Sequence, residues 1–198
     1  MSSTDMNAEH IPVIVGVGEF VDRPVQPGDA LEPVALMERA LRAAQDDAGA
    51  SLLAQIESIE LIGLISWRYA DPVSLLCERL AIAPARKLNA SMGGETPIRL
   101  IHEAALRIAR GELRVAAIVG GEAMHARSRA AKEKVALPWT PAVSKEAAVQ
   151  FPASRFEMSP VAKRLGVTDP AQIYPLYEMA TQAAWRQTPA QAQAESAQ

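Results

Sequence analysis

The segment from Met92 to Pro97 has the residue types best suited to chemistry. It reads Met-Gly-Gly-Glu-Thr-Pro and is predicted to join a strand to a helix through Gly93 and Gly94. Backbone N–H groups at such a helix start can hold an anion or an oxyanion. A tight strand-to-helix turn without a ligand explains the same residues, and both interpretations stay open at this point.

A second glycine pair, Gly16 and Gly18, begins a dinucleotide-binding pattern. The third glycine of that pattern is missing, because Val21 stands in its place, and no helix is predicted to start there. A turn at the end of a strand is the simpler interpretation, so a nucleotide site of this type is not expected.

The three histidines, His10, His102 and His125, do not have the spacing of metal ligands, and no metal site is expected. Only His125 follows a predicted strand, where binding sites of parallel sheets lie. His125 is therefore a candidate substrate-binding residue.

The single cysteine, Cys77, falls on an apolar stripe with Leu76 and Leu80. A cysteine inside such a helix usually acts as a small hydrophobic residue. It is also away from the helix N-terminus, which could have lowered its pKa. We predict that Cys77 is buried and inert.

Strands and helices alternate along the part of the chain that must position these residues. Short apolar runs predict strands at 11–17, 56–66, 87–91 and 115–119. Amphipathic spacing with start and stop signals predicts helices at 33–47, 72–83 and 97–111. The order β-α-β-α-β-α-β predicts an α/β fold with a mainly parallel sheet.

Residues 122–198 have a different composition, with several prolines and little periodicity. Trp139, Phe151 and Phe156 are expected to be exposed there, and helices are expected at 160–165 and 169–185. We therefore expect an α/β core at 11–121 and a loop-rich, partly helical insertion at 122–198.

The composition indicates a globular protein, with 49% hydrophobic residues, 22% charged residues and a net charge of −3. Without a basic surplus, nucleic acid is not an expected partner, and the basic residues near 127–134 are expected to form a solvated face. No apolar run reaches the roughly 20 residues that span a bilayer, and no signal peptide is predicted. We expect a cytoplasmic protein that does not act at a membrane.

Several of these segments together resemble the thiolase superfamily over residues 11–125. They are the strand and helix that end at Asp47-Ala48-Gly49, the helix that ends at Ala109-Arg110-Gly111, and the stretch Val119 to Met124. Thiolases have a similar "GG-x-E-x-M" stretch, and Glu122 and Met124 fall on its Glu and Met. One glycine is shifted, because the family's pair falls on Val119 and Gly120.

The resemblance implies a thiolase-like N-terminal half that acts as an acetyl-CoA acetyltransferase in lipid metabolism. The family's nucleophilic cysteine, in a pattern like Cys-x-Ser-Gly-Leu-x-Ala, falls on Gly94, with Thr96 at the Ser and Pro97 at the Gly. This chain therefore resembles the subset that lacks the cysteine, and no catalytic residue is assigned. The expected substrate-binding residues are Gly93, Gly94, Glu95, Thr96 and His125.

The family's two histidine motifs and second cysteine lie in a second half, so the chain is expected to be truncated. The expected ligand is an acyl-CoA or related thioester, without a further cofactor, and a homodimer is an expected assembly. The alternative function is a non-catalytic thioester-binding or scaffold protein of the same fold. A nucleotide-dependent oxidoreductase is a third interpretation, disfavoured by Val21.

Overall fold

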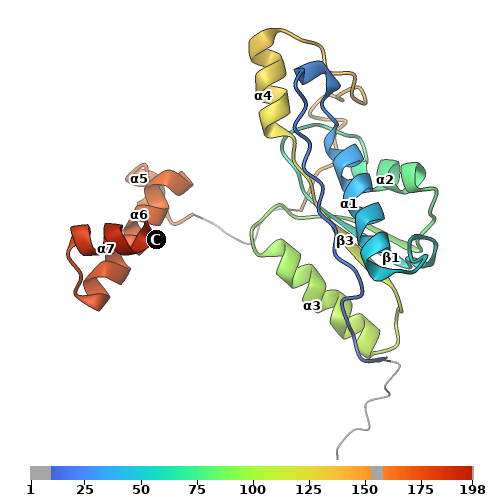
Figure 1. The fold of residues 1–198 in the computed structure, drawn as a ribbon, viewed down its shortest axis with the longest axis horizontal. Helices are drawn as coiled ribbons and strands as arrows, with labels where there is room; N and C mark the ends of the chain where they lie inside the picture. The colour runs from blue at the N-terminus through green and yellow to red at the C-terminus, as the bar shows by residue number, and fades with distance from the viewer. Residues whose placement is uncertain (1–9, 153–157, 198) are drawn as a thin grey trace, which may run out of the picture. The chain divides into compact units, whose positions relative to one another are not determined.

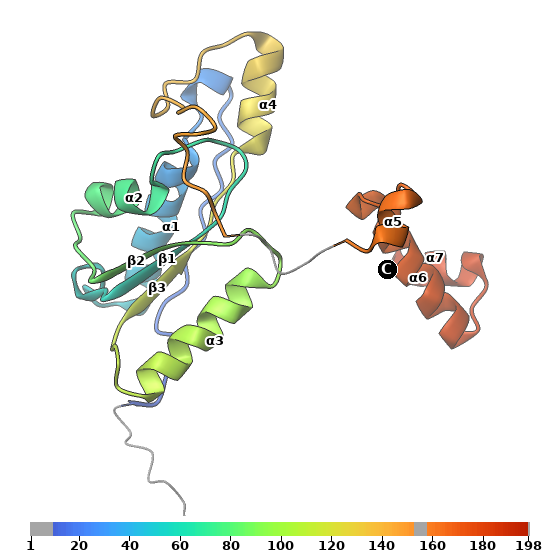
Figure 2. The ribbon, with the colours of Figure 1, turned by 180° about the vertical axis from the view of Figure 1, so that it is seen from behind.

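The computed structural model describes residues 10–152 and 158–197, which form one compact unit through residue 152 and another from residue 158. The first unit (Figure 1) holds a parallel sheet of three strands in the order β2-β1-β3, all of which are labelled in Figure 2. The strands are β1 (Ser58–Ile62), β2 (Arg86–Ala90) and β3 (Ala116–Val119). The α/β fold with a parallel sheet is thus confirmed.

Helices cover both faces of this sheet (Figure 2). Helices α1 (Pro33–Ala48) and α2 (Pro72–Leu80) lie on one face, and α3 (Thr96–Ala109) lies on the other. Two short 3-10 helices, η2 (Pro27–Asp29) and η3 (Leu53–Gln55), flank α1. The main core forms between the sheet and the first two helices, with Met37, Leu61 and Leu76 fully buried.

Local signals explain where these helices start and stop. The first ends at Gly49, whose left-handed φ of 62° costs a glycine little. The second starts at Asp71, whose carboxylate accepts a hydrogen bond from the Ser74 N–H at 3.3 Å. It ends at the left-handed Ala81, before the expected stop at Pro84.

The predicted strand at 11–17 is wrong, because these residues join no strand of the sheet. The segment runs beside α1 (Figure 1). A Cβ at Gly16 or Gly18 would lie 2.2 or 2.1 Å from a backbone oxygen of that helix, so only glycine permits the approach. Periodicity indicated an apolar segment but could not specify whether a strand or a helix would lie beside it.

The region after β3 is more ordered than its composition suggested. Helix α4 (Met124–Glu133) was not expected there. Trp139, expected to be exposed, is buried edge-on against Trp67 with ring centroids 4.9 Å apart, and its Nε1–H donates to the Ala30 carbonyl at 2.6 Å. Phe151 is half-buried against the core, and Phe156 lies outside the described residues. The prolines around Trp139 and Phe151 indicated a loop, and loop residues were expected to be exposed. A loop can nevertheless pack its aromatic side chains against the core.

The second unit consists of three helices, α5 (Pro160–Arg164), α6 (Pro170–Trp185) and α7 (Pro189–Ser196). The first two match the helices predicted at 160–165 and 169–185, and α7 was not expected. Asp169 and Thr188 each form a capping box, which satisfies N–H groups at both helix starts. The domain division expected at residue 121 stays a prediction.

Candidate functional site

The segment 92–97 connects the end of β2 to the start of α3, as predicted. Glu95 is the residue before the helix, and its side chain makes no cap. Thr96 is the first helical residue and is fully buried. Its hydroxyl contacts the Glu95 carboxylate and Ser91, the residue that follows β2.

A line of polar side chains holds the turn together. The Thr96 hydroxyl donates to the Glu95 carboxylate at 3.2 Å and lies 3.3 Å from Ser91 Oγ. Arg99 donates from one nitrogen to Ser91 Oγ at 3.0 Å and from another to Glu103 at 2.9 Å. Sequence reasoning missed Ser91 and Arg99, although Arg99 lies one helical turn after the predicted site.

The turn leaves backbone donors for a ligand. The Thr96 N–H is occupied, because it donates to the Gly93 carbonyl at 3.2 Å. Within residues 10–152 and 158–197, the N–H groups of Gly94, Glu95 and Ile98 donate no hydrogen bond. The helix dipole adds a partial positive charge at this end, so these donors suit an oxygen that carries negative charge.

The two glycines of the turn have different surroundings. A Cβ at Gly93 would lie 2.3 Å from the Glu95 carboxylate and 3.1 Å from the Thr96 hydroxyl. A Cβ at Gly94 would meet no atom within 4 Å. The position matched to the family's nucleophile is therefore open and has room for a side chain.

No hydrogen bond or ion pair in the described part of the chain joins His125 to this turn. His125 lies on the first turn of α4 and is exposed. The four turn residues are adjacent and His125 belongs to a different element, so the five-residue substrate-binding set stays a prediction.

Glu122 has a structural role that the sequence did not reveal. Its carboxylate accepts hydrogen bonds from the Ile65 and Ser66 N–H groups at 2.7 and 2.9 Å. The buried Ser66 hydroxyl in turn accepts from the Ala123 N–H at 3.1 Å. This Glu122 clamp ties the segment after β1 to the segment after β3.

Cys77 lies in α2 and is buried, as predicted, with 1% of its surface exposed. Burial raises the pKa of its thiol, and the charges of Asp71 and Glu78 act in the same direction against Lys87. A neutral, buried thiol is a poor nucleophile, so Cys77 does not substitute for a cysteine at position 94.

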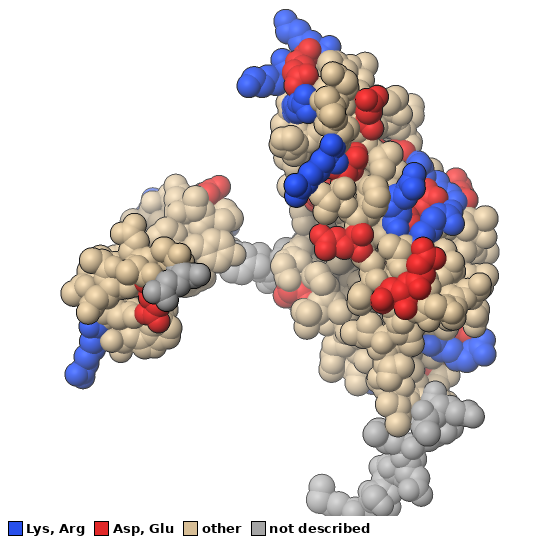
Figure 3. All heavy atoms as spheres, viewed as in Figure 1, with Lys and Arg blue, Asp and Glu red and all other residues tan. Residues whose placement is uncertain are grey.

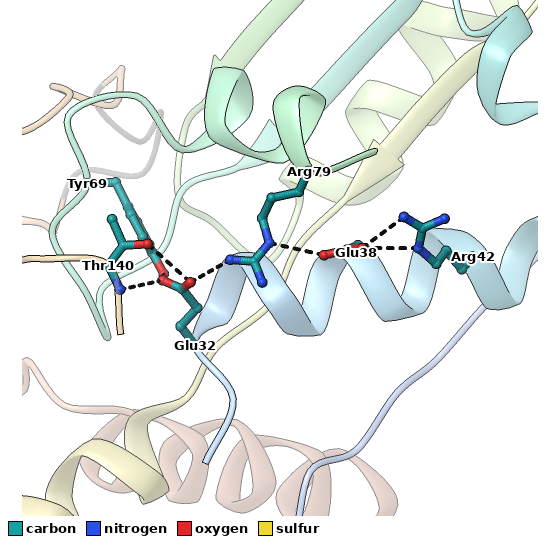
Figure 4. A network of polar contacts seen from close by, with 6 residues as sticks. All are labelled: Glu32, Glu38, Arg42, Tyr69, Arg79 and Thr140. Carbon is teal, nitrogen blue, oxygen red and sulfur yellow. Dashed lines mark hydrogen bonds and ion pairs between the residues drawn. The ribbon is translucent and has the colours of Figure 1, made fainter. Parts of the chain in front are cut away.

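A buried polar network holds the loops on the α1 and α2 side (Figure 4). The Glu32 carboxylate accepts from Arg79 at 2.7 Å, the Tyr69 hydroxyl at 2.9 Å and the Thr140 N–H at 3.2 Å. Burial, together with Glu32, raises the pKa of the Tyr69 hydroxyl. Because the acceptor is fully paired, this network supports the fold and offers no site.

Charges of both signs are interspersed on the visible face (Figure 3). Of the basic residues near α4, Arg127, Lys132 and Lys134 are exposed. Arg129 is paired with Glu133 at 2.7 Å. None of the described helices has the length and apolar character needed to span a membrane.

Comparisons with known proteins found little. No family model and no curated protein matches the chain. Among solved structures, the chain is similar to a monomeric SCP2-thiolase like protein type 1 from Mycobacterium smegmatis, with 29% identity and a TM-score of 0.49. The match covers 57% of this chain and 23% of that one, so this chain corresponds to less than a quarter of that protein.

Proposed function

We propose that this chain is a thiolase-like protein that binds an acyl-CoA or related thioester at the 92–97 turn and does not carry out thiolysis. The observation that carries the proposal is the set of unpaired N–H groups at Gly94, Glu95 and Ile98 at the start of α3. A thioester oxygen is an acceptor of the kind these donors suit. The choice of a thioester as the ligand rests on the family resemblance. The proposed cytoplasmic location and role in lipid metabolism rest on it as well.

The residues present argue against thiolysis. Covalent acyl transfer needs an activated nucleophile, and Gly94 provides none. Cys77 is buried in another helix. No hydrogen bond or ion pair among the described residues joins His125, the histidine predicted to bind substrate, to the turn.

Binding can be tested by titrating the chain with acetyl-CoA and with NAD, using calorimetry. Acetyl-CoA should bind and NAD should not. Glu95→Pro removes one N–H donor, and Pro is compatible with the φ of −81° at this position. We expect its Kd for acetyl-CoA to rise about 2- to 10-fold, the range for one lost hydrogen bond.

Glu95→Ala is the matched control, because it removes the carboxylate and keeps the N–H. Its Kd should not rise. Equal weakening in both variants would mean that the side chain, rather than the backbone, contacts the ligand. Binding of NAD instead of acetyl-CoA would favour the oxidoreductase interpretation and contradict the proposal.

Acetyl-CoA acetyltransferase activity is the second candidate, and the open space at Gly94 is the observation that makes it testable. A thiol in Gly94→Cys would lie at a helix start that lowers its pKa. We still expect no acetoacetyl-CoA cleavage, because a restored nucleophile gains little without its cooperating groups. Cleavage above the uncatalysed rate would reveal a base among residues 1–198, and a Gly94→Cys/His125→Ala double variant would test His125.

The proposal includes a homodimer formed through the outer side of α3. Ile98 and Leu106 are 71% and 41% exposed there. Exposed apolar groups on one helix side favour association. Ile98→Lys should lower the dimer fraction measured by sedimentation, and a wild-type chain that is monomeric at every concentration would contradict the assembly.

A further inference from the structure

No strand within residues 10–152 and 158–197 covers the outer edge of β3, because the sheet order is β2-β1-β3. The Ser58 N–H of β1 donates to the Val115 carbonyl at 3.4 Å, so the backbone of Val115 faces β1. Backbone groups alternate in direction along a strand, so the N–H and C=O groups of Ala116 and Ile118 point away from β1. Among the described residues nothing pairs with them, and they form a free row of donors and acceptors.

This edge lacks the usual protection against pairing with another chain. Edge strands are commonly protected by charged residues, by proline or by a covering segment. The sequence of β3 is Ala-Ala-Ile-Val, without a charge or a proline. An edge of this kind pairs readily with any extended chain that reaches it.

A second row of free backbone groups faces the same space. The segment 12–18 and β3 both line an open groove of about 550 Å³, which we call the edge groove. Within the described ranges, the backbone of residues 13–16 makes no hydrogen bond. The segment is held against α1 instead, because the Val17 N–H donates to the Asp47 carboxylate at 2.8 Å and Gly16 packs on the helix backbone. It therefore forms a wall of the edge groove and leaves the β3 edge uncovered.

The size of the edge groove suits one extended chain. A strand residue occupies about 160 Å³, from a rise of about 3.3 Å, a strand spacing of about 4.8 Å and a layer spacing of about 10 Å. The volume therefore holds about three to four strand residues, and β3 has four. Helices α1 and α3, through Leu41 and Ile101 among others, line the two sides. A second copy does not fit, because its own β3 edge is recessed between the same walls and the two edges cannot meet.

We infer that the edge groove binds an extended peptide segment of another protein, which adds a strand beside β3. One edge of the peptide pairs with Ala116 and Ile118, and its other edge pairs with residues 13–16. Main-chain hydrogen bonds supply affinity in this mode of recognition, and the side chains supply specificity. The peptide side chains are apolar, since no charged residue lines the groove. The inference is independent of thioester binding at the 92–97 turn.

The test uses the synthetic peptide acetyl-Lys-Val-Ala-Val-Ala-Val-Lys-amide, whose lysines lie outside the groove and keep it soluble. Its Kd is compared by calorimetry with those of two forms that are N-methylated at alternate residues, one set in each form. N-methylation removes donors and keeps the side chains. Because the inserted peptide uses alternate residues for its two edges, each form should bind at least about 10-fold more weakly, since several hydrogen bonds worth about 2- to 10-fold each are lost.

The methylated peptides also show which results overturn the inference. Equal affinity of all three peptides would mean that side chains alone hold the probe on an apolar surface. Weakening in only one methylated form would place the probe along a single edge and contradict insertion between two. No binding of the unmodified peptide would likewise overturn the inference.

A backbone variant of the chain identifies the edge that is used. Ile118→Pro removes an N–H that points to the free edge and removes no bond to β1, a position at which an edge strand tolerates proline. We expect its Kd for the unmodified peptide to rise about 2- to 10-fold, the range for one lost hydrogen bond. Ile118→Val is the matched control, because it keeps the N–H and an apolar side chain, and its Kd should not change. Wild-type affinity in a folded Ile118→Pro would overturn the inference.

Hydrogen exchange on the wild-type chain keeps the test decisive if Ile118→Pro does not fold. The Ile118 amide should exchange fast in the free chain and slowly with the peptide bound, whereas the Ala117 amide, which faces β1, should be protected in both states. Slow exchange at Ile118 in the free chain would show an edge that is already covered. Protection independent of protein concentration would assign the cover to residues 13–16, and protection that rises with concentration would assign it to a second copy. Either result would overturn the inference.

Discussion

The two faces of the sheet bury different chemistry although the same strands provide both. On the side of α1 and α2, β1 contributes Ile59 and Leu61, which are fully buried in a continuous apolar core. On the side of α3, the same strand contributes Ser58 and Glu60, which are buried just as deeply.

The polar side is an ionic cluster under α3. Arg86 from β2 donates to the Glu60 carboxylate, and Arg107 from α3 lies 3.8 Å from it. Both guanidinium groups remain partly exposed, at 39% and 25% of their side-chain surfaces. One Glu60 oxygen, Oε2, is buried and has no hydrogen-bond partner within the described ranges.

The difference between the two sides of the sheet indicates which side stabilises the fold and which side positions α3. Burial of apolar side chains stabilises a fold in proportion to the area removed from water. A buried ion pair adds little net stability, because desolvation opposes the attraction. The α1 and α2 side should therefore carry most of the stability, and the α3 side should fix the position of the helix that starts at the candidate site.

The largest expected effect is on thiol reactivity. A buried thiol reacts only when the structure opens, and for a domain with a stability of about 5 kcal/mol or more this slows the reaction at least 10³-fold. Cys77 in the native chain should therefore react slowly with iodoacetamide. The extent of alkylation over time is measured by mass spectrometry. A cysteine introduced in Cys77→Ala/Gly94→Cys should react at least 10²-fold faster, because position 94 is open. Similar rates would mean that the apolar side is not closed.

Leu61→Ala should lower the free energy of unfolding by about 2–5 kcal/mol, the usual cost of a cavity in a packed core. Leu61 is fully buried among α1 and α2 residues. Urea unfolding followed by circular dichroism gives the value. A loss below about 1 kcal/mol would show that this side is not the main core.

Glu60→Leu should cost less, about 1–2 kcal/mol, although the residue is as buried as Leu61. It removes the unpaired Oε2, and the partly exposed guanidinium groups can turn to water. Glu60→Gln is the control of similar size. If Glu60→Leu costs as much as Leu61→Ala, the ionic cluster contributes as much to stability as the apolar core, and the comparison between the two faces fails.

The smallest expected effect is on how the stability of the fold depends on pH. Burial opposes ionisation of Glu38, but hydrogen bonds and charges from Arg79 and Arg42 outweigh it and lower its pKa below the ordinary 4.5. Burial likewise opposes ionisation of Asp71, and hydrogen bonds from Ser74 and Asn89 lower its pKa below 3.8. A lowered pKa gives stability that is present above the unfolded pKa and is lost as the pH falls through the folded pKa.

Unfolding midpoints measured between pH 7 and pH 3 should therefore fall mainly below pH 4.5, the ordinary pKa of Glu38. Glu38→Gln/Asp71→Asn should flatten that fall. Both groups are partly solvated, so a small change is expected. An unchanged profile in the double variant would assign the pH dependence to other carboxylates.

The sequence predicted most of the elements but only part of the site. The predicted end of the first helix at 47 and start of the second at 72 agree with α1 and α2, because the left-handed Gly49 and the N-capping Asp71 act locally. The partner of residues 11–17 could not be predicted, because it depends on contacts distant in sequence. The predicted exposure of Trp139 was wrong for the same reason, since its hydrogen bond to the Ala30 carbonyl joins residues far apart in the sequence.

At the site, the turn and the two glycines were predicted from residue type and order. The roles of Ser91 and Arg99 were not, because their contact depends on how β2 and α3 face each other.

The Glu122 clamp has a consequence for what a sequence motif at this residue can mean. Its carboxylate holds two backbone N–H groups at the carboxyl end of the sheet, so folding alone is a reason to retain it. A glutamate at this position is therefore required by the architecture whether or not the chain is an enzyme, and a motif match at Glu122 reports the fold rather than the chemistry.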